Sequence, residues 1–261
     1  MRPKIKFFFI GILAGALLAG CNINVNNNSQ SEYGENFSIT QPLGQRGGIS
    51  IENINGNINV VGDDTVTSVI ISGRKTVQDQ SVDEAKSHIG DIEISTVLTD
   101  SVVELRTTQP NSSGDRNYRV DYNIRVPKNW TVSINNVNGS VDVQDINNSV
   151  GISQVNGTIT AEDIAGSVES NLTNGNIYGR VTLPQNGECT LSTLNGNILL
   201  AVPTSTSASV TASVLNGSVS VSNLSLTLAS SSRTSLKGTL GTGEGTISLS
   251  ALNGTVELTS Y

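Results

Sequence analysis

The sequence is short of the side chains on which most metal sites and nucleic-acid-binding surfaces depend. Among its 261 residues there are one histidine, two cysteines and only 4% aromatic residues. Without a cluster of histidine and cysteine, the chain lacks the usual ligand set of a zinc site. Basic residues are outnumbered, with 15 Lys and Arg against 22 Asp and Glu. This balance argues against nucleic acid as a partner and against electrostatic docking on anionic lipid.

The apolar run near the N-terminus is too short to span a membrane as a helix. Residues 7–18 are apolar and follow a cationic start at residues 2–6, whereas a spanning helix needs ~20 residues. This combination is typical of a secretory signal peptide. The run ends in Leu18-Ala19-Gly20-Cys21, which resembles a bacterial lipobox with cleavage before Cys21. We predict a signal peptide over residues 1–20 and lipidation of Cys21; an ordinary secretory peptide with an unrelated cysteine is the alternative.

A lipidated Cys21 predicts an extracytoplasmic protein held on a membrane, since stable anchoring takes at least two acyl chains. Residues 21–36 are mostly polar and are predicted to form a flexible tether. Asn22 stands where an Asp is associated with inner-membrane retention in enteric bacteria, so the outer membrane is favoured if the cell has two membranes. Without the leader the net charge is about −10. Cys189 then has no second cysteine with which to form an internal disulfide.

The dipeptide Asn-Gly recurs in similar surroundings and is the strongest signal of architecture. Each copy has an apolar or small residue, then the turn, then an alternation of apolar residues. From Asn138 onward the copies follow at intervals of 18, 18, 21, 21 and 37 residues. Self-similarity at such a period is typical of a solenoid, in which each repeat buries its apolar face against its neighbours. The copies are INGNINV (54–60), VNGSVDV (137–143), VNGTITA (155–161), TNGNIYG (173–179), LNGNILL (194–200), LNGSVSV (215–221) and LNGTVEL (252–258).

The apolar positions after each turn alternate with a period of two, which is typical of strands with one face inward. Equivalent strands of successive coils are predicted to stack in parallel about 4.8 Å apart. This stacking puts Cys189 over Val168 and Val150 and under Val210, as a small core residue. We predict an all-β, parallel β-solenoid (β-helix) with coils of 18–21 residues and one short helix, as a single domain over residues 37–261. Independent β-hairpins at each Asn-Gly are the alternative.

The Asn-Gly pair suits a tight turn, because glycine adopts positive φ without a steric penalty and asparagine tolerates it. The repeated asparagines are also predicted to hydrogen-bond along the axis as an asparagine ladder. A row that binds glycan or a cation is the functional alternative. The expected ladder consists of Asn138, Asn156, Asn174, Asn195 and Asn216.

Residues 62–134 interrupt the repeat and form an elaborated N-terminal half. Ser81–Ile89 has helical spacing of its apolar residues, with Ser81 and Glu84 in capping-box relation. Residues 117–126 alternate cleanly, with Tyr118 and Tyr122 on the same face as three aliphatic residues. The other expected elements are strands over 92–98 and 102–108, a polar loop over 110–115, and a degenerate coil with a longer loop over 222–245.

Together these features resemble a known family. The lipobox, the extended N-terminal strands, the segment YNIRVPKNWTVSINNVNGSVDV (122–143) and the serial NG-x-[IV] coils are similar to the bacterial "putative adhesin" domain family of unknown function. The resemblance covers most of residues 37–258. It implies a β-solenoid at a cell surface, and it brings no catalytic residues with it.

Asp145 and Asp163 are the one enzyme-like feature. Both lie seven residues after their asparagine, so a solenoid would stack them on neighbouring coils, an arrangement that β-helical polysaccharide enzymes use. The equivalent positions of the next coils are Val181 and Val202, and Arg180 is one position out of register. Solvated turns are therefore the favoured interpretation, with a weak Ca²⁺ contact as second choice.

Two further motifs have ordinary interpretations. His88 lies on the predicted helix, where a Ser-His-Asp arrangement would need a nucleophile from the solenoid, so a surface histidine is expected. The segment GTGEG (241–245) lacks the Lys-Ser/Thr that follows a phosphate-binding loop, so a turn is expected.

The few aromatic residues could form a sugar-stacking platform from Trp130, Tyr118 and Tyr122. The two tyrosines share their face with aliphatic residues, however, which is a core pattern. The opposite face of that strand, bearing Arg119 and Arg125, is the better candidate contact surface, against the default of a solvated face.

The sequence thus predicts a lipid-anchored cell-envelope protein with a structural or adhesive role, without enzymatic activity, cofactor or metal. Its partners are the membrane through the anchor and an envelope or surface glycan or protein, and not nucleic acid. A polysaccharide-acting enzyme using Asp145 and Asp163 is one alternative. An envelope-stress or signalling scaffold that binds a partner protein is the other.

Overall fold

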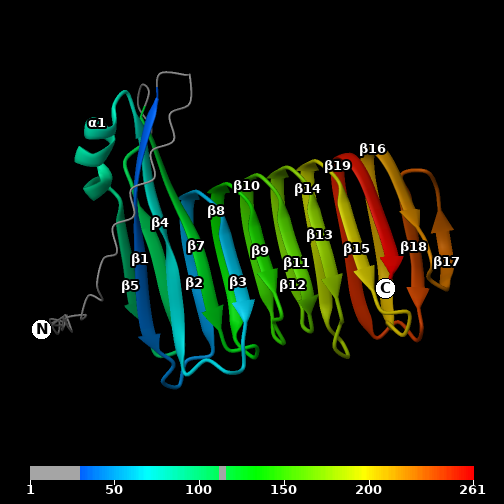
Figure 1. The fold of residues 1–261 in the computed structure, drawn as a ribbon. Coiled ribbons are helices and arrows are strands. Elements are labelled where there is room, and N and C mark those ends of the chain that lie inside the picture. Colours follow the sequence, from blue (N-terminus) through cyan, green and yellow to red (C-terminus); the bar gives the residue numbers. More distant parts are fainter. Residues whose placement is uncertain (1–29, 112–115) are drawn as a thin grey trace, which may run out of the picture.

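The computed structural model describes residues 30–111 and 116–261. Within these ranges the chain is all-β, with one short α-helix, a single 3₁₀ turn and one 19-stranded sheet (Figure 1). Cys21, the signal peptide over 1–20 and most of the loop predicted at 110–115 lie outside the described residues.

The bounds of the elements follow the order of the chain. The N-terminal half contains β1 (Ser31–Pro42), β2 (Gly48–Asn55), β3 (Ile58–Gly62), β4 (Ser68–Asp79), α1 (Val82–Ser87), η1 (Ile89–Asp91), β5 (Glu93–Leu98), β6 (Val102–Thr108) and β7 (Asn117–Val126). The repeats contain β8 (Thr131–Asn138), β9 (Val141–Gln144), β10 (Val150–Asn156), β11 (Ile159–Ile164), β12 (Val168–Asn174), β13 (Ile177–Val181), β14 (Glu188–Asn195) and β15 (Ile198–Val202). The C-terminal part contains β16 (Ala208–Val221), β17 (Leu226–Ser231), β18 (Ser235–Leu240) and β19 (Gly245–Ser260).

The repeats build two parallel ladders. The strands β8, β10, β12 and β14 pair side by side in the first ladder, and β9, β11, β13 and β15 pair in the second. Consecutive strands of the chain therefore belong to different ladders, and each repeat lies one strand spacing, about 4.8 Å, beyond the last. Inward side chains stack in columns and form the core. One such column is Ile51, Ile134, Ile152, Ser170, Leu191, Leu249 and Ala212.

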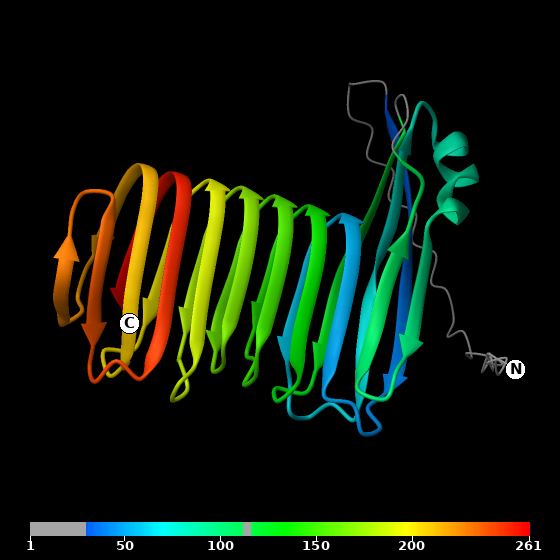
Figure 2. The same cartoon turned by 180° about the vertical axis from the view of Figure 1, so that it is seen from behind.

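The sheet is mixed, which corrects the expectation of a purely parallel stack. At the N-terminal end β4 pairs antiparallel with both β1 and β7, and β5 pairs antiparallel with β6. At the other end β18 pairs antiparallel with both β16 and β17. Residues 222–245, expected as a degenerate coil, instead supply these two antiparallel strands. They lie at the end of the molecule farthest from α1 (Figure 2).

The spatial order of the repeats also differs from their order in the chain. The last strand, β19, pairs with β14 and β15 on one side and with β16 on the other, so it lies between earlier repeats (Figure 1). The prediction of the two neighbours of Cys189 is therefore correct on one side only. Cys189 pairs with Val168 as predicted, but on its other side it meets Ile247, and Val210 lies one layer further.

An unbroken asparagine ladder runs through all seven copies, so the prediction of a ladder is confirmed and extended. In each step the side-chain Nδ2 of one asparagine donates to Oδ1 of the next, at 2.6–2.9 Å. The order in space is Asn55, Asn138, Asn156, Asn174, Asn195, Asn253 and Asn216.

The glycine after each asparagine is required for two separate reasons. Gly157 has φ 129°, a conformation that side chains rarely adopt. A Cβ at this position would also collide with the carbonyl oxygen of Gly139 in the neighbouring repeat, and Gly175 meets Gly157 in the same way. The layers approach so closely at this corner that only glycine fits.

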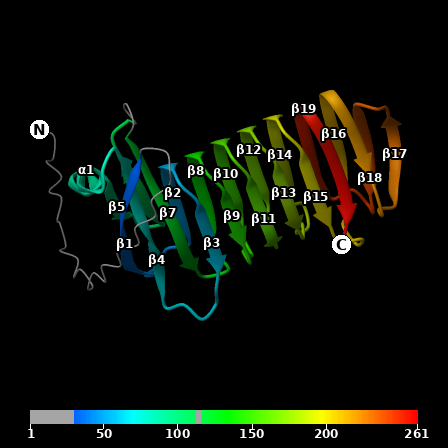
Figure 3. The same ribbon diagram turned by 45° about the horizontal axis from the view of Figure 1, so that its top comes forward.

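The N-terminal elaboration agrees in most elements with the sequence. Ser81 caps α1 by accepting a hydrogen bond from Glu84 N at 3.2 Å. In β7 the alternate side chains from Tyr118 to Val126 are buried, as predicted. The strand β1 begins at Ser31, however, so residues 31–36, assigned above to the tether, belong to the sheet. Figure 3 shows α1 beside β1 and β5 at this end of the molecule.

We expect Gly157→Val to destabilise the protein well beyond a surface substitution. Backbone strain alone costs about 1–3 kcal/mol, and the collision with the Gly139 carbonyl adds to it. Since each layer is the template for the next, hydrogen exchange should rise around Asn138 and Asn174 as well as at residue 157. Gly151→Val is the matched control, because a Cβ there meets nothing within 4 Å. Thermal melting and hydrogen exchange are measured for both variants. Equal melting temperatures of Gly157→Val and Gly151→Val would show that the corner does not need glycine.

We expect the Cys189 thiol to resist modification in the native state. It is 0% exposed, and burial raises its pKa from 9.0 to about 12. In the Cys21→Ser protein, where Cys189 is the remaining cysteine, a bulky thiol reagent should react roughly a hundredfold more slowly than after unfolding. The control is an exposed thiol, introduced by Ser153→Cys in a protein that also carries Cys189→Ala. Equal reaction rates of the two native proteins would contradict the burial of Cys189.

The raised pKa of Cys189 also makes the stability of the protein depend on pH. As pH rises above about 9, the unfolded thiol ionises while the folded one does not, so the free energy of unfolding should fall between pH 9 and 12.

Candidate functional site

A groove of about 1090 Å³ crosses the first ladder on the described surface. Its lining comes from the ends of successive strands, in the spatial order β2, β8, β10, β12, β14 and β19. The C-terminal end of β6, with residues 106–109, adds the lining at the β2 end. The groove therefore runs along the stack and meets an equivalent set of side chains in every layer.

An exposed aliphatic row forms one part of this lining. The residue before each Asn-Gly points outward, and in the groove it is Ile54, Val137, Val155, Leu194 or Leu252, each 36–48% exposed. Thr173 takes the position in the one remaining layer. The seventh copy, Leu215, is 68% exposed and is not part of the groove lining. We call the row that lines the groove the aliphatic stripe; it consists of Ile54, Val137, Val155, Thr173, Leu194 and Leu252. A contiguous exposed row of this kind is unusual on a monomer and marks a contact surface.

The groove is polar at its β2 end. Glu52 and Arg106 form an ion pair at 2.9 Å there, with both side chains about half exposed. Beneath the stripe the inward position of each layer changes along the axis, from Asn53, Asn136 and Gln154 to Leu172, Thr193 and Ala251. The floor thus becomes less polar away from β2, whereas the row of lining residues on its other side stays polar throughout, with Glu52, Asn135, Ser153, Asn171, Ser192 and Ser250.

The three amides at the polar end are buried and only partly bonded. Asn53 Nδ2 donates to Val120 O at 3.3 Å, and Gln154 Nε2 donates to Asn156 O at 2.9 Å. The side-chain oxygens of Asn53, Asn136 and Gln154 have no hydrogen-bond partner among the described residues. Buried acceptors without a donor are costly, and these oxygens are closed off from the groove surface, so the cluster marks a locally unfavourable polar floor.

The two aspartates with the enzyme-like spacing do not line the groove. Asp145 accepts from Lys128 Nζ at 2.9 Å, and this hydrogen bond raises the pKa of Lys128. Asp163 pairs with Arg180 at 3.2 Å. Both aspartates have positive φ, 59° and 53°, which Asp tolerates in a turn. Each carboxylate is thus held in its own exposed ion pair, Asp145 at a bend after β9 and Asp163 at an irregularity inside β11, where a turn was expected.

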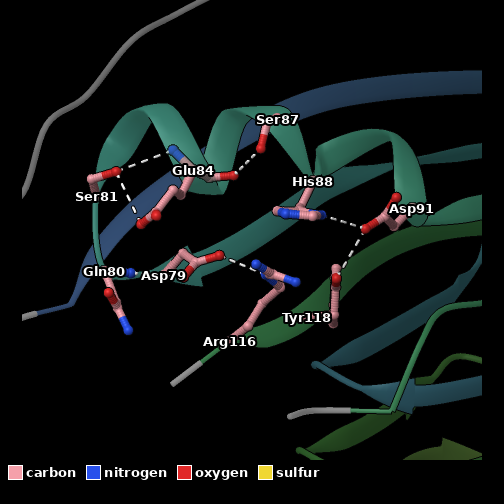
Figure 4. A network of polar contacts seen from close by, with 9 residues as sticks. All are labelled: Asp79, Gln80, Ser81, Glu84, Ser87, His88, Asp91, Arg116 and Tyr118. Carbon is pink, nitrogen blue, oxygen red and sulfur yellow. Dashed lines mark hydrogen bonds and ion pairs between the residues drawn. The ribbon is translucent and has the colours of Figure 1, made fainter. Parts of the chain in front are cut away.

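His88 belongs to a polar network that fastens α1 and η1 to the sheet (Figure 4). Its Nδ1 lies 2.8 Å from Asp91 Oδ2, which also accepts from the Tyr118 hydroxyl at 3.0 Å. These hydrogen bonds, that of His88 foremost, lower the pKa of Asp91. The neighbouring Ser87 hydroxyl donates to Glu84 O rather than to the imidazole. The arrangement is a His-Asp-Tyr chain and differs from a Ser-His-Asp triad.

The aromatic residues and arginines singled out from the sequence are occupied in the structure. Trp130, Tyr118 and Tyr122 are buried in the core, so they form no sugar platform on the described surface. Arg119 pairs with Asp121 at 3.1 Å, and Arg125 lies 3.6 Å from Asp63. The arginine-bearing face is therefore charge-paired and, unlike the Glu52–Arg106 pair, lies outside the groove lining.

The segment GTGEG is a turn, as predicted, and its backbone has a partner. The N–H groups of Thr242, Gly243 and Glu244 all donate to Ser207 Oγ, at 3.0–3.3 Å. A nest of backbone N–H groups can hold an anion, but here the serine hydroxyl fills it. The side chains of the asparagine row likewise already have hydrogen-bond partners, because each is bonded to its neighbour in the ladder.

The sequence analysis missed the aliphatic stripe as a surface, although its signal is visible. Six of the seven residues before Asn-Gly are Ile, Val or Leu. Their apolar side chains resemble core residues, but the period-two alternation of the strand places them outward, as in β10, where Ile152 and Gln154 are buried and Val155 is exposed. Glu52 and Arg106 were missed because they come from strands far apart in the chain.

Within the described ranges no group of three or more potential metal-ligating His, Cys, Asp or Glu side chains comes together. None of the described helices is long and apolar enough to cross a membrane.

Comparison with known proteins shows a shared fold. No family model and no curated protein matches the chain. Among solved structures, it is similar to a "putative cell adhesion protein" from Clostridium sporogenes, at 17% identity and a TM-score of 0.50, over 88% of this chain and 100% of that one. It is also similar to a "putative adhesin" from Bacteroides fragilis, at 12% identity and a TM-score of 0.35, over 87% of this chain and 97% of that one. The chain thus shares its overall fold with the Clostridium protein.

Proposed function

We propose that the protein is a non-enzymatic, lipid-anchored component of a cell envelope, whose outer surface makes adhesive or structural contacts. The observation that carries this proposal is the groove along the first ladder, which repeats the same lining in layer after layer. A repeated surface suits a repeated or extended partner, because many weak contacts add up to avid binding. The partner is an envelope or surface glycan or protein.

The scaffold in this proposal is a β-solenoid. Two parallel ladders joined at an Asn-Gly corner, with inward columns of side chains, support this description. The antiparallel strands at both ends then serve as caps, which cover edges that would otherwise pair with other chains. Likeness to the Clostridium protein supports the same overall fold.

The anchor in this proposal is Cys21, with the protein placed outside the cytoplasm. The Leu-Ala-Gly-Cys motif after a short apolar run supports it. A polar segment between Cys21 and β1 at Ser31 would hold the sheet away from the lipid surface. In a cell with two membranes, Asn22 favours the outer one.

We expect Cys21→Ser to abolish lipidation. Cells that express the variant should incorporate no radioactive palmitate into the protein, and the protein should leave the detergent phase. Cys189→Ala is the matched control, because it removes the other cysteine, which is buried, and should keep the label. Continued labelling of the Cys21→Ser protein would contradict the anchor.

We expect the groove face to carry the contact with the envelope partner. Immobilised Cys21→Ser protein should retain a glycan or protein from intact envelopes, and Asn171→Arg should reduce that retention at least tenfold by placing a charged side chain in the lining. Thr160→Arg makes the same change on the second ladder, outside the groove lining, and should have no effect. Equal retention by both variants would remove the groove from the contact.

The two alternative functions give different results in the same experiment. A retained partner protein from the cell's own envelope, without binding to external surfaces, would favour a signalling scaffold. Cleavage of a retained glycan that is lost in the Asp145→Asn and Asp163→Asn double variant would favour an enzyme. The ion pairs of both aspartates and their distance from the groove lining speak against the enzyme.

A further inference from the structure

We propose that the groove binds a single-chain amphiphile with a zwitterionic head, its acyl chain along the aliphatic stripe and its head at the Glu52–Arg106 end. The inference rests on the lining of the groove alone and concerns the same surface as the proposed adhesive contact, so a bound lipid and an envelope partner would compete for it. It commits to a lipid-like ligand and distinguishes it from a glycan.

The walls favour an acyl chain over a sugar. The exposed groups of the stripe are aliphatic, and none of the groove-lining residues in the described part of the chain is aromatic. A sugar ring usually stacks on an aromatic face, whereas a methylene chain needs only contiguous aliphatic surface. The volume of about 1090 Å³ lies just above the roughly 300–1,000 Å³ of pockets that take one small ligand with an apolar body and a few polar contacts.

The length of the groove matches one such ligand. Its lining extends over the successive strands from β2 to β19, which gives about 24 Å at a spacing of 4.8 Å per strand. One leaflet of a bilayer, chain and head together, is ~20–22 Å thick. A single-chain lipid therefore occupies the groove from end to end.

The distribution of charge and polarity gives the ligand a direction. Beyond the β2 end the lining is uncharged, as an acyl chain requires. At the β2 end Glu52 and Arg106 present one negative and one positive group 2.9 Å apart, about half exposed to solvent. An ammonium group complements Glu52 and a phosphate complements Arg106, so a zwitterionic head fits where a purely anionic head would meet Glu52.

The floor of the groove is polar at the same end as the charged pair. Asn53 is 4% exposed, lines the groove beside Glu52, and its Oδ1 has no hydrogen-bond partner among the described residues. The floor of the groove changes to Leu172 and Ala251 toward the other end, where the chain tail would lie.

The test is calorimetric titration of the Cys21→Ser protein with 1-palmitoyl lysophosphatidylethanolamine below its micellar concentration. We expect saturable binding of one lipid per protein. Leu194→Asn combined with Leu252→Asn should weaken it roughly tenfold or more, because two aliphatic contacts are lost. Leu215→Asn is the matched control, since it changes the same position of a repeat outside the groove lining and should bind as the unaltered protein does. All three residues are exposed, so folding should persist, and thermal melting verifies it.

The head is tested with a second pair of ligands and variants. Glu52→Gln should weaken binding of the zwitterionic lipid but not of palmitate, whereas Arg106→Gln should weaken both. Three results would overturn the proposal: no saturable binding of the lipid, equal binding by the stripe variant and its Leu215 control, or displacement of the lipid by a glucan oligosaccharide that binds more tightly. Because these measurements use the soluble protein and no envelope partner, their failure leaves the adhesive role untouched.

Discussion

The close approach of successive layers at the Asn-Gly corner is the constraint on which the rest of the structure depends. At this corner a glycine with positive φ lies against the carbonyl oxygen of the glycine one layer below, with no room for a Cβ. The asparagine before it bonds to its counterparts above and below. Such a contact fixes both the spacing and the register of the layers, because a shift by one residue would bring a side chain into the carbonyl and turn every inward side chain outward. The seven corners therefore act together to align both ladders.

Register at the corner also decides what the surface offers. Because the asparagines are aligned, the residues one place before them are aligned too, and they form the aliphatic stripe. Any regular stack of this kind produces rows of equivalent side chains along its axis, so the chemistry of a row is set by which residue type recurs at one position. Here the row is aliphatic except at Thr173, and the charged pair of Glu52 and Arg106 comes from strands outside the regular run. The elaborated N-terminal half thus gives an otherwise uniform surface two different ends.

Much of this fold follows from the sequence, and the reasons for the exceptions are specific. The inward residues of β7, the capped helix at Ser81 and the burial of Cys189 depend on local periodicity and could be predicted. The position of β19 between β14 and β16 could not, because the copies at Asn195, Asn216 and Asn253 have the same Leu-Asn-Gly sequence and nothing local selects a neighbour. The antiparallel pair at β17 and β18 was missed for a related reason, since its polar sequence carries no repeat. The groove shares this limit, because its two charged residues meet only through the pairing of β2 with β6.

The inward polar residues connect the corner to the groove. Asn136 Nδ2 donates to Gly56 O at 3.3 Å, Gln154 Nε2 donates to Gly139 O at 2.5 Å, and Thr193 Oγ1 donates to Gly175 O at 3.4 Å. In each case the acceptor is a carbonyl against which the next glycine packs. These side chains therefore satisfy backbone groups that the corner would leave short of donors. The amides do so with their nitrogen only, and each remaining oxygen is left buried without a partner, at a cost of roughly 1–3 kcal/mol. Layers with Leu172 and Ala251 at this position avoid that cost. Those aliphatic side chains offer no donor to the corner carbonyl, however, so the amide layers satisfy a buried backbone acceptor at the expense of a side-chain oxygen.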